Sequence, residues 1–234
     1  MAESTQPTRV ADILRFIMDN VSITYPGPGQ AVITIERPDT LNSLTVATLT
    51  ELTAAGQEVS ARGESLNVVL LRGRGRAFCS GLDLGLLDDN SGEGMFAAVR
   101  EGAILMESLE AIPAVTVAVL GGAVVGGGVV LASACDLRIA ARDTYFSMPE
   151  VDLGVPVRWG GVPRLVREMG SALAREIMMT CRPFTADEAR AAGFLNQVVA
   201  ADQLEDTVQE LVKTLCAKPV QPLQAVKRRV IEAG

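Results

Sequence analysis

The chain has 234 residues, 48% of them hydrophobic and 21% charged, which is enough to bury a substantial core in one domain. A formal net charge of −7 and the lack of a dense lysine and arginine stripe argue against nucleic acid as a partner. The sequence contains no histidine, which excludes Ser-His-Asp and Cys-His nucleophilic systems and histidine-ligated zinc within this chain. Acid–base chemistry would fall to Asp, Glu, Lys, Tyr or Cys.

The cysteines and the terminal segments bear on the compartment. The four cysteines form no CxxC pair and are far apart, at Cys79, Cys135, Cys181 and Cys216. This usage is typical of a reduced cytoplasmic protein rather than of a disulfide framework. Residues 1–20 lack a basic segment followed by an apolar one, so no secretory signal is expected. Pro113 and several glycines interrupt the most apolar run, 111–134, which favours a protein without a membrane span.

Apolar runs separated by turn residues predict alternating strands and helices after a loosely held arm. The predicted strands are 31–38, 67–75, 114–121 and 136–141. The predicted helices are 45–62, 95–112 and 127–135, with a turn-rich stretch at 88–94 and a mostly helical region from 162 onward. A threonine is available to cap the first helix, and Thr185 with Glu188 forms a predicted capping box. This alternation indicates an α/β fold.

Two junctions between a strand and a turn are rich in glycine. They read NVVLLRGRGRAFCSGLDL at 67–84 and AVTVAVLGGAVVGGGVVLA at 114–132, and the second leads directly into a helix. Two backbone N–H groups converging there on one oxygen would form an oxyanion hole. Taken singly, each cluster is explained better by tight turns and close packing, and it is the ordered pair that favours an oxyanion hole. Neither GxxxxGK[ST] nor GxGxxG is present, which argues against a phosphate cradle.

Four ordered motifs resemble those of the crotonase superfamily, the enoyl-CoA hydratase/isomerase fold. They read GRGRAFCSGLDL, GGAVVGGGVVLASACDLRIAA, YFSMPEVDLGVPVRWGGVPRL and FTADEARAAGFLNQVV. The resemblance extends from about residue 18 to residue 230. It is specific for the fold and for acyl-CoA binding, and much less specific for the reaction.

The resemblance implies a spiral of ββα units and a helical C-terminal region that mediates trimer formation. It divides the chain into an N-terminal arm at 1–17, a spiral core at 18–190 and a C-terminal region at 191–234. Members of the superfamily usually continue for some tens of residues beyond this point, so the trimerisation region is expected to be shortened here. The expected assembly is a homotrimer, or a hexamer formed by two trimers.

The resemblance also implies a thioester substrate whose carbonyl oxygen accepts hydrogen bonds from the amides of Leu82 and Gly127. Coenzyme A enters as part of the substrate, and neither a metal nor a tightly bound cofactor is expected. The residues expected to contact coenzyme A or the acyl group are Ser80, Gly81, Asp83, Gly126, Val130, Arg158 and Trp159. Asp83 is also expected to buttress the turn beside Leu82, and Asp136 to serve a structural role.

One acid of the hydratase pattern is missing. Val130 occupies the position of one hydratase glutamate, whereas the second is present as Glu150. Arg158 occupies the position of a further aspartate found in dienoyl-CoA isomerases, and arginine cannot act as a base near neutral pH. A single carboxylate suffices to move a double bond, so we expect an enoyl-CoA isomerase with Glu150 as the catalytic residue.

Two alternatives remain open at this point. The chain could be a hydratase-like lyase that uses Glu150 with another acid, or an acyl-CoA-binding protein without catalytic activity. Arg158 could pair with Glu150, which would lower the pKa of the glutamate and weaken it as a base, or it could bind a carboxylate on the substrate.

Overall fold

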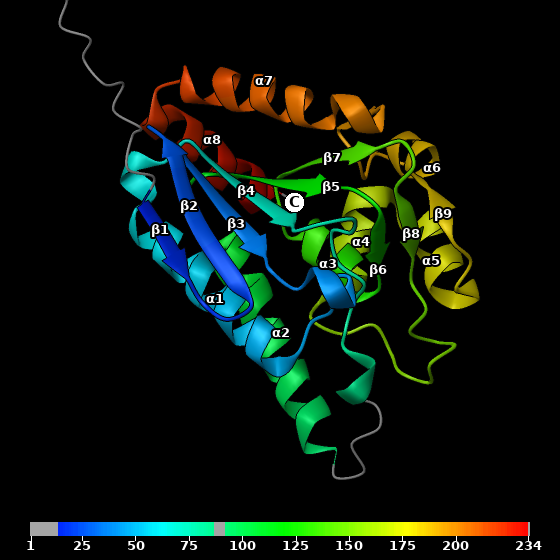
Figure 1. The fold of residues 1–234 in the computed structure, drawn as a ribbon. Helices are drawn as coiled ribbons and strands as arrows, with labels where there is room; N and C mark the ends of the chain where they lie inside the picture. Colours follow the sequence, from blue (N-terminus) through cyan, green and yellow to red (C-terminus); the bar gives the residue numbers. More distant parts are fainter. Residues whose placement is uncertain (1–13, 87–91, 234) are drawn as a thin grey trace, which may run out of the picture.

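The computed structural model describes residues 14–86 and 92–233, in which a seven-stranded sheet is the central element (Figure 1). The strands of this sheet, in spatial order, are β1 (Leu14–Ile17), β2 (Val21–Gly27), β3 (Gln30–Ile35), β4 (Val68–Gly73), β5 (Val115–Leu120), β7 (Leu137–Ala141) and β10 (Gln197–Val199). The pairs β1–β2 and β2–β3 are antiparallel, and every pair from β3 to β10 is parallel. A second, three-stranded sheet contains β6 (Ala123–Val125), β8 (Tyr145–Ser147) and β9 (Phe184–Thr185).

Helices connect these strands and cover the main sheet. Their bounds are α1 (Val46–Ala61), α2 (Glu93–Glu110), α3 (Gly127–Ser133), α4 (Gly161–Met169), α5 (Ser171–Thr180), α6 (Ala186–Ala191), α7 (Leu204–Cys216) and α8 (Val220–Ala233). Short 3₁₀ turns occur at Pro38–Thr40, Gly63–Ser65, Leu84–Leu86 and Ala201–Gln203. Figure 1 shows α1 and α2 on one side of the main sheet and α7 on the other.

The parallel strands are apolar at successive positions because both faces of the sheet are covered. In β4, Val68 and Leu70 belong to the cluster that contains Val208 of α7. Val69 and Leu71 belong to the larger cluster, to which α1 and α2 contribute. Side chains alternate between the two faces of a strand, so a strand covered on both sides has no polar face. This explains why the sequence of β4 shows a continuous apolar run instead of an alternating pattern.

The described residues confirm the α/β class and most of the predicted elements. β4, β5 and β7 lie within the predicted strands, and β3 begins one residue before its predicted strand. α1, α2 and α3 match the predicted helices to within two residues at each end. The Thr45 side chain caps α1 by accepting a hydrogen bond from the Thr48 amide. Thr185 and Glu188 form the predicted capping box at the start of α6. Both helix starts are therefore specified by local sequence.

Several strands were not predicted, among them the seven-residue β2. β6, β8, β9 and β10 have two or three residues each, which is too short for an alternating pattern to be recognised. Residues 14–17 of the predicted arm form β1, antiparallel to β2, and the rest of the arm lies outside the described residues. Most of the predicted turn at 88–94 also lies outside them, and α2 begins at Glu93.

The C-terminal helices are attached to the strand ends by polar contacts. Asn67 donates hydrogen bonds through Nδ2 to the carbonyls of Leu215 and Lys218, at 3.1 and 2.8 Å. The buried Lys227 of α8 donates to the carbonyl of Ala114 at 3.0 Å and forms an ion pair with Asp136 at 2.7 Å. Asp136 thus has the structural role expected of it. The division of the chain into arm, core and C-terminal region stays a prediction.

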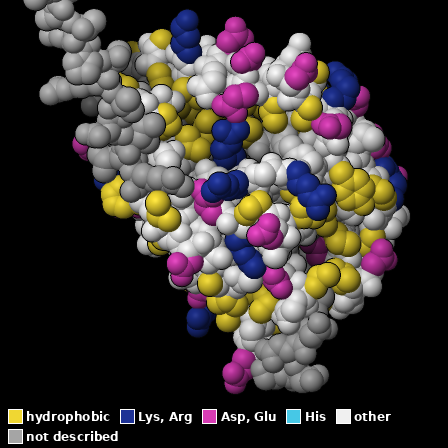
Figure 2. All heavy atoms as spheres, viewed as in Figure 1, with side chains coloured by type: hydrophobic (Ala, Val, Ile, Leu, Met, Phe, Trp, Pro, Cys, Tyr) yellow, Lys and Arg dark blue, Asp and Glu magenta, His cyan; other side chains and the backbone are white. Residues whose placement is uncertain are grey.

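Charged side chains of both signs are mixed on the surface. On the face shown in Figure 2, lysines and arginines lie among aspartates and glutamates and form no continuous basic patch over the described residues. On this face, therefore, positive charge is not concentrated as it is where a phosphate backbone binds.

Candidate active site

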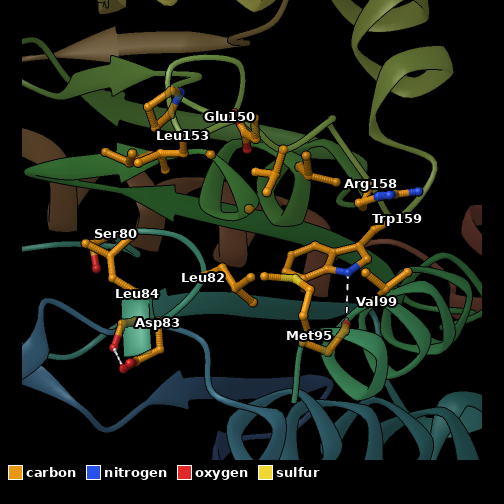
Figure 3. Close-up of a pocket in the computed structure, with 18 of the residues that line it drawn as sticks. Ser80, Leu82, Asp83, Leu84, Met95, Val99, Glu150, Leu153, Arg158 and Trp159 are labelled. Atoms are coloured by element: carbon orange, nitrogen blue, oxygen red, sulfur yellow. Dashed lines mark hydrogen bonds between the residues drawn. The ribbon is translucent and has the colours of Figure 1, made fainter. Parts of the chain in front are cut away.

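A cavity of about 780 Å³ lies where the loop after β4, the start of α3, helix α2 and the loop after β8 meet (Figure 3). All but one of the predicted site residues line it, namely Ser80, Leu82, Asp83, Gly126, Gly127, Val130, Glu150, Arg158 and Trp159. Gly81 is the exception. It packs against Val125, whose carbonyl oxygen would lie 2.7 Å from a Cβ at residue 81.

The backbone around Leu82 leaves one N–H group free at the cavity. Leu44 and Leu82 form a parallel bridge in which the Leu44 amide donates to the Gly81 carbonyl at 2.8 Å and the Asp83 amide donates to the Leu44 carbonyl at 3.0 Å. In such a bridge the N–H of the intervening residue points away from the partner strand. Within the described residues, the Leu82 amide has no hydrogen-bond acceptor. It is therefore available to a ligand.

The second free N–H group belongs to Gly127, the first residue of α3. The first amides of a helix have no intrahelical acceptor, and no other acceptor for this one occurs among the described residues. A Cβ at Gly81 would lie 3.5 Å from the Gly127 nitrogen, so the two segments that carry the free amides are in contact. The pairing expected from the two glycine-rich junctions is thus present in the fold.

Two of the glycines are required by the backbone at this point. Gly81 has φ +89° and Gly126 has φ +50°, conformations that residues with a side chain rarely adopt. A Cβ at Gly126 would also lie 2.7 Å from Oε1 of Glu150. Glycine at 126 therefore provides both the turn into α3 and the space for the carboxylate.

Glu150 brings one carboxylate to the cavity from the loop that follows β8. Its Oε2 is buried and has no hydrogen-bond partner among the described residues. Burial raises the pKa of this carboxyl group above its ordinary value, and a hydrogen bond from its own backbone opposes that rise. The group can therefore hold a proton at a higher pH than an exposed glutamate does.

The site has no carboxylate at position 130. Val130 is buried in α3, and its methyl groups would lie 2.7 and 3.2 Å from a Cβ at Gly161, the first residue of α4. The valine thus contributes to the packing of α3 against α4 as well as to the cavity wall. Chemistry that requires a proton donor or acceptor at this position is excluded.

The second acid at the cavity, Asp83, is engaged in structure. Its Oδ2 accepts a hydrogen bond from the Ser43 hydroxyl at 2.7 Å, and its Oδ1 accepts one from the Gly85 amide at 3.2 Å. Arg37 lies 3.7 Å from the same carboxylate. These contacts bear out the expectation that Asp83 buttresses the turn beside Leu82, and they leave Glu150 as the acid without partners.

Arg158 and Trp159 lie in the loop before α4, as expected. The Arg158 side chain is exposed and extends away from Glu150 in Figure 3. The structure does not show the possible pairing of Arg158 with Glu150, because the described residues offer no partner to the buried Glu150 oxygen. Of the two possibilities for Arg158, pairing with Glu150 is therefore not present, and burial raises the pKa of Glu150.

Sequence reasoning missed the contribution of α2 to the cavity. Met95, Phe96, Ala98 and Val99 line it. Their apolar spacing in the sequence is that of a helix packed on a core, and it gives no sign that one turn of the helix borders a cavity. The one available signal is Phe96, which is 78% exposed near the start of the helix.

No metal site or membrane span is evident in the described part of the chain. Residues 14–86 and 92–233 contain no group of three or more cysteine or acidic side chains placed to hold a metal ion. Among the same residues, no helix has the length and apolar character needed to cross a bilayer.

Comparison with known proteins agrees with this geometry. Residues 28–233 match the family model described as Enoyl-CoA hydratase/isomerase. A short-chain-enoyl-CoA hydratase of Clostridium acetobutylicum is 33% identical over 199 residues, which cover 85% of this chain and 76% of that protein. The crystal structure of an enoyl-CoA hydratase from Bacillus anthracis superimposes with a TM-score of 0.86 at 31% identity and covers 91% of this chain and 82% of that one.

A further structural neighbour contains a ligand. It is a Thermobifida fusca protein assigned to the enoyl-CoA hydratases, solved in complex with acetoacetyl-CoA, with a TM-score of 0.81 and 29% identity over 92% of this chain and 87% of that one. The family match and the shared fold together confirm the resemblance seen in the sequence. The chain belongs to the enoyl-CoA hydratase/isomerase family, the crotonase superfamily.

Proposed function

We propose that this chain is an enoyl-CoA isomerase that converts a 3-enoyl-CoA into a 2-enoyl-CoA, with Glu150 as its single proton shuttle. The observation that carries the proposal is the pairing of one unpartnered, buried carboxylate oxygen with two free backbone amides at one cavity. Among the described residues that line the cavity, Glu150 is the one acid that has an unpartnered buried oxygen, and Val130 occupies the position where hydration would need a second acid. This favours a reaction that requires only one acid.

The substrate proposed is a thioester of coenzyme A. The complex of the Thermobifida fusca neighbour with acetoacetyl-CoA supports this substrate class. The thioester oxygen would accept hydrogen bonds from the amides of Leu82 and Gly127. The part of coenzyme A nearest the thioester would lie along Ser80 and Gly81, beside the turn that Asp83 holds in place.

The reaction follows from this arrangement. The Glu150 carboxylate removes a proton from C2, and the electrons of the broken C–H bond move toward the thioester oxygen to give a dienolate. The amides of Leu82 and Gly127 stabilise the negative charge as it develops on that oxygen. The protonated Glu150 then returns the proton to C4, and the double bond lies between C2 and C3. The reaction requires neither a water molecule nor a second acid.

The environment of Glu150 suits both halves of this transfer. Because burial raises its pKa, the carboxylate binds the C2 proton more strongly than an exposed glutamate would. The proton-transfer efficiency of a general base is greatest when its pKa lies near the working pH. The unpaired state of Oε2 also leaves the group free to serve two carbon atoms in turn.

Hydration of a 2-enoyl-CoA is the second candidate function, because the C. acetobutylicum relative and the B. anthracis structure are named as hydratases. Hydration requires that a water molecule be deprotonated and that a proton be delivered to C2. Among the described residues of the cavity, Glu150 would have to perform both steps, since Val130 carries no proton and Asp83 is held by Ser43 and Gly85. We therefore place hydration second.

A direct experiment separates these functions. The purified protein is mixed with a 3-enoyl-CoA, and the conjugated 2-enoyl thioester is followed by its ultraviolet absorbance, with Glu150→Gln as the matched variant. General acid–base catalysis contributes about 10²–10⁴-fold, so a loss of this size is expected in the variant. In a parallel reaction with a 2-enoyl-CoA, mass spectrometry detects any addition of water.

Each outcome has a distinct meaning. Conversion that depends on Glu150 supports the isomerase, and addition of water without a double-bond shift supports the hydratase. Absence of both reactions, with thioester binding retained in a fluorescence titration of Trp159, the only tryptophan, would indicate a binding protein and contradict the proposal.

We also propose a homotrimer or hexamer, as the family resemblance implies. Helix α8 supports self-association because it exposes Val226, Val230 and Ile231, which are 61, 66 and 51% exposed. Contiguous exposed apolar side chains of this kind commonly mark an interface. Light scattering coupled to size-exclusion chromatography measures the assembly, and a monomer at micromolar concentration would contradict this proposal.

A further inference from the structure

The two ends of the cavity differ in chemical character. Figure 3 shows Ser80, Asp83 and Leu84 at one end, Trp159, Met95 and Val99 at the other, and Leu82 and Glu150 between them. The first end carries the hydroxyl and carboxylate groups, and the second is formed by α2 and the indole, with the exposed Arg158 beside it. A thioester placed with its oxygen at the Leu82 and Gly127 amides and its coenzyme A arm at the polar end would direct its acyl chain toward Trp159.

Trp159 is held in place by its backbone and by its ring. Its Nε1 donates a hydrogen bond to the Ala98 carbonyl of α2 at 3.0 Å, and its own carbonyl accepts one from Nη1 of Arg164 at 2.8 Å. Arg164 in turn binds both carboxylate oxygens of Glu110 on α2, at 2.6 and 2.8 Å. The indole is thus a fixed wall between α2 and α4, since α2 holds it directly and through Arg164.

The indole also fits closely between α2 and α3, because each of these helices has a glycine where it faces the ring. A Cβ at Gly102 of α2 would lie 2.1 Å from Cε2 and Nε1 of the ring, and a Cβ at Gly127 would lie 2.6 Å from Cζ3. A glycine inside a helix costs about 1 kcal/mol relative to alanine. The close approach of the indole provides a structural reason for Gly102 in the middle of α2.

We propose that Trp159 closes the acyl end of the cavity and restricts the enzyme to short acyl groups. The proposal rests on the proposed function for the position of the thioester oxygen. The ring contacts Gly127, whose amide would hold that oxygen, so only a few carbons of the chain fit before the indole is reached. Trp159 is a specificity-determining residue in this proposal, and the reacting atoms remain with Glu150.

Binding of saturated acyl-CoA thioesters tests this proposal without any turnover, because these compounds have no double bond to move. Isothermal titration measures affinity for acetyl-, butyryl-, hexanoyl-, octanoyl- and decanoyl-CoA in the unsubstituted protein and in Trp159→Leu. The unsubstituted protein is expected to bind decanoyl-CoA at least about tenfold more weakly than butyryl-CoA, since a pocket discriminates about tenfold or more for one methylene it cannot accommodate.

The variants carry the decisive comparison. Trp159→Leu should raise the affinity for decanoyl-CoA relative to butyryl-CoA by about tenfold or more, because the end wall is removed. Trp159→Phe, which leaves most of the core packing intact, should give a smaller shift in the same direction. Leu84→Ala at the opposite end, where Leu84 is 61% exposed, is the matched control and should change all thioesters alike.

Three results would overturn the proposal. They are equal affinity of the unsubstituted protein for butyryl- and decanoyl-CoA, a Trp159→Leu effect that is the same for every chain length, and no binding of any thioester. The proposed function can fail separately. Suppose that Trp159→Leu removes the limit on acyl length but the protein does not isomerise a 3-enoyl-CoA. The role of Trp159 would then be supported and the isomerase would be refuted.

Discussion

The contact between Gly126 and Glu150 allows the position of the carboxylate to be changed without removing it. In Gly126→Ala the new Cβ would lie 2.7 Å from Oε1 of Glu150, whereas ordinary van der Waals contact begins at 3.4 Å. The carboxylate must therefore retreat by about 0.7 Å or rotate. A misplacement of about 1 Å at a reacting group can cost about 10²-fold in rate, so we expect turnover to fall by about 10- to 100-fold.

The same substitution also strains the backbone, and a matched variant separates the two effects. Gly126 has φ +50° and ψ −115°, so alanine there should lower the free energy of unfolding by about 1–3 kcal/mol. Gly154 has φ +73° in the loop that carries Glu150, and nothing lies within 4 Å of a Cβ built there. Gly154→Ala should therefore be destabilised by about 1–2 kcal/mol and keep its turnover.

The assay combines three measurements on both variants: turnover of a 3-enoyl-CoA, thioester affinity from the fluorescence of Trp159, and the free energy of unfolding in urea. Turnover is expected to fall in Gly126→Ala alone, at thioester concentrations that saturate both proteins. Full turnover in Gly126→Ala, or equal losses in the two variants, would refute the reasoning that Gly126 makes room for the Glu150 carboxylate.

Three further predictions concern stability. Burial raises the pKa of Glu150 in the folded state, so the stability that its protonated form contributes is fully present below the unfolded pKa of about 4.3 and is lost as pH rises through the folded pKa. Glu150→Gln should therefore raise Tm at pH 8 and leave Tm nearly unchanged at pH 4. A lower Tm of Glu150→Gln at pH 8 would contradict the burial argument. Arg164→Met removes the hydrogen bonds to Glu110 and to the carbonyl of Trp159. The free energy of unfolding in urea should fall by about 1.5–3 kcal/mol, and the tryptophan emission should shift to the red. An unshifted emission would show that Arg164 does not hold the indole. Val130→Glu places an unpaired carboxylate in the packed contact between α3 and α4. Calorimetry should therefore show that the free energy of unfolding falls by about 3–5 kcal/mol, without a gain of hydratase activity. A stable variant that hydrates a 2-enoyl-CoA would refute this account of Val130.

The sequence predicted the long helices and the strands β3, β4, β5 and β7 because their signals are local, whereas β2, the longest strand, was missed. Neighbouring residues specify the threonine caps at Thr45 and Thr185 and the apolar runs of β4 and β5. The structure has the corresponding helix starts and strands within a few residues of the expected bounds. The short strands β6, β8 and β9 depend on pairing with one another across large sequence separations. A run of two or three residues carries too little periodicity to show such pairing.

The candidate site was predicted unevenly for a similar reason. The backbone donors at Leu82 and Gly127 and the acid at Glu150 lie within motifs that can be recognised from sequence, and the fold brings them to one cavity. The fit of Trp159 between Gly102 and Gly127 could not be foreseen, because it depends on the approach of α2 to the loop before α4. The sequence could not decide whether Arg158 pairs with Glu150, because tertiary packing sets the direction of a side chain in a loop.

The transfer of one proton by Glu150 from C2 to C4 is the central claim, and an isotope label follows that proton directly. A 3-enoyl-CoA fully deuterated at C2 is converted in ordinary water under single-turnover conditions, and nuclear magnetic resonance locates deuterium in the 2-enoyl product. The unsubstituted protein should deliver deuterium to C4, and Glu150→Gln should give about 10²–10⁴-fold slower conversion. Conversion by Glu150→Gln at the unsubstituted rate, with only solvent hydrogen at C4 in both proteins, would contradict the account.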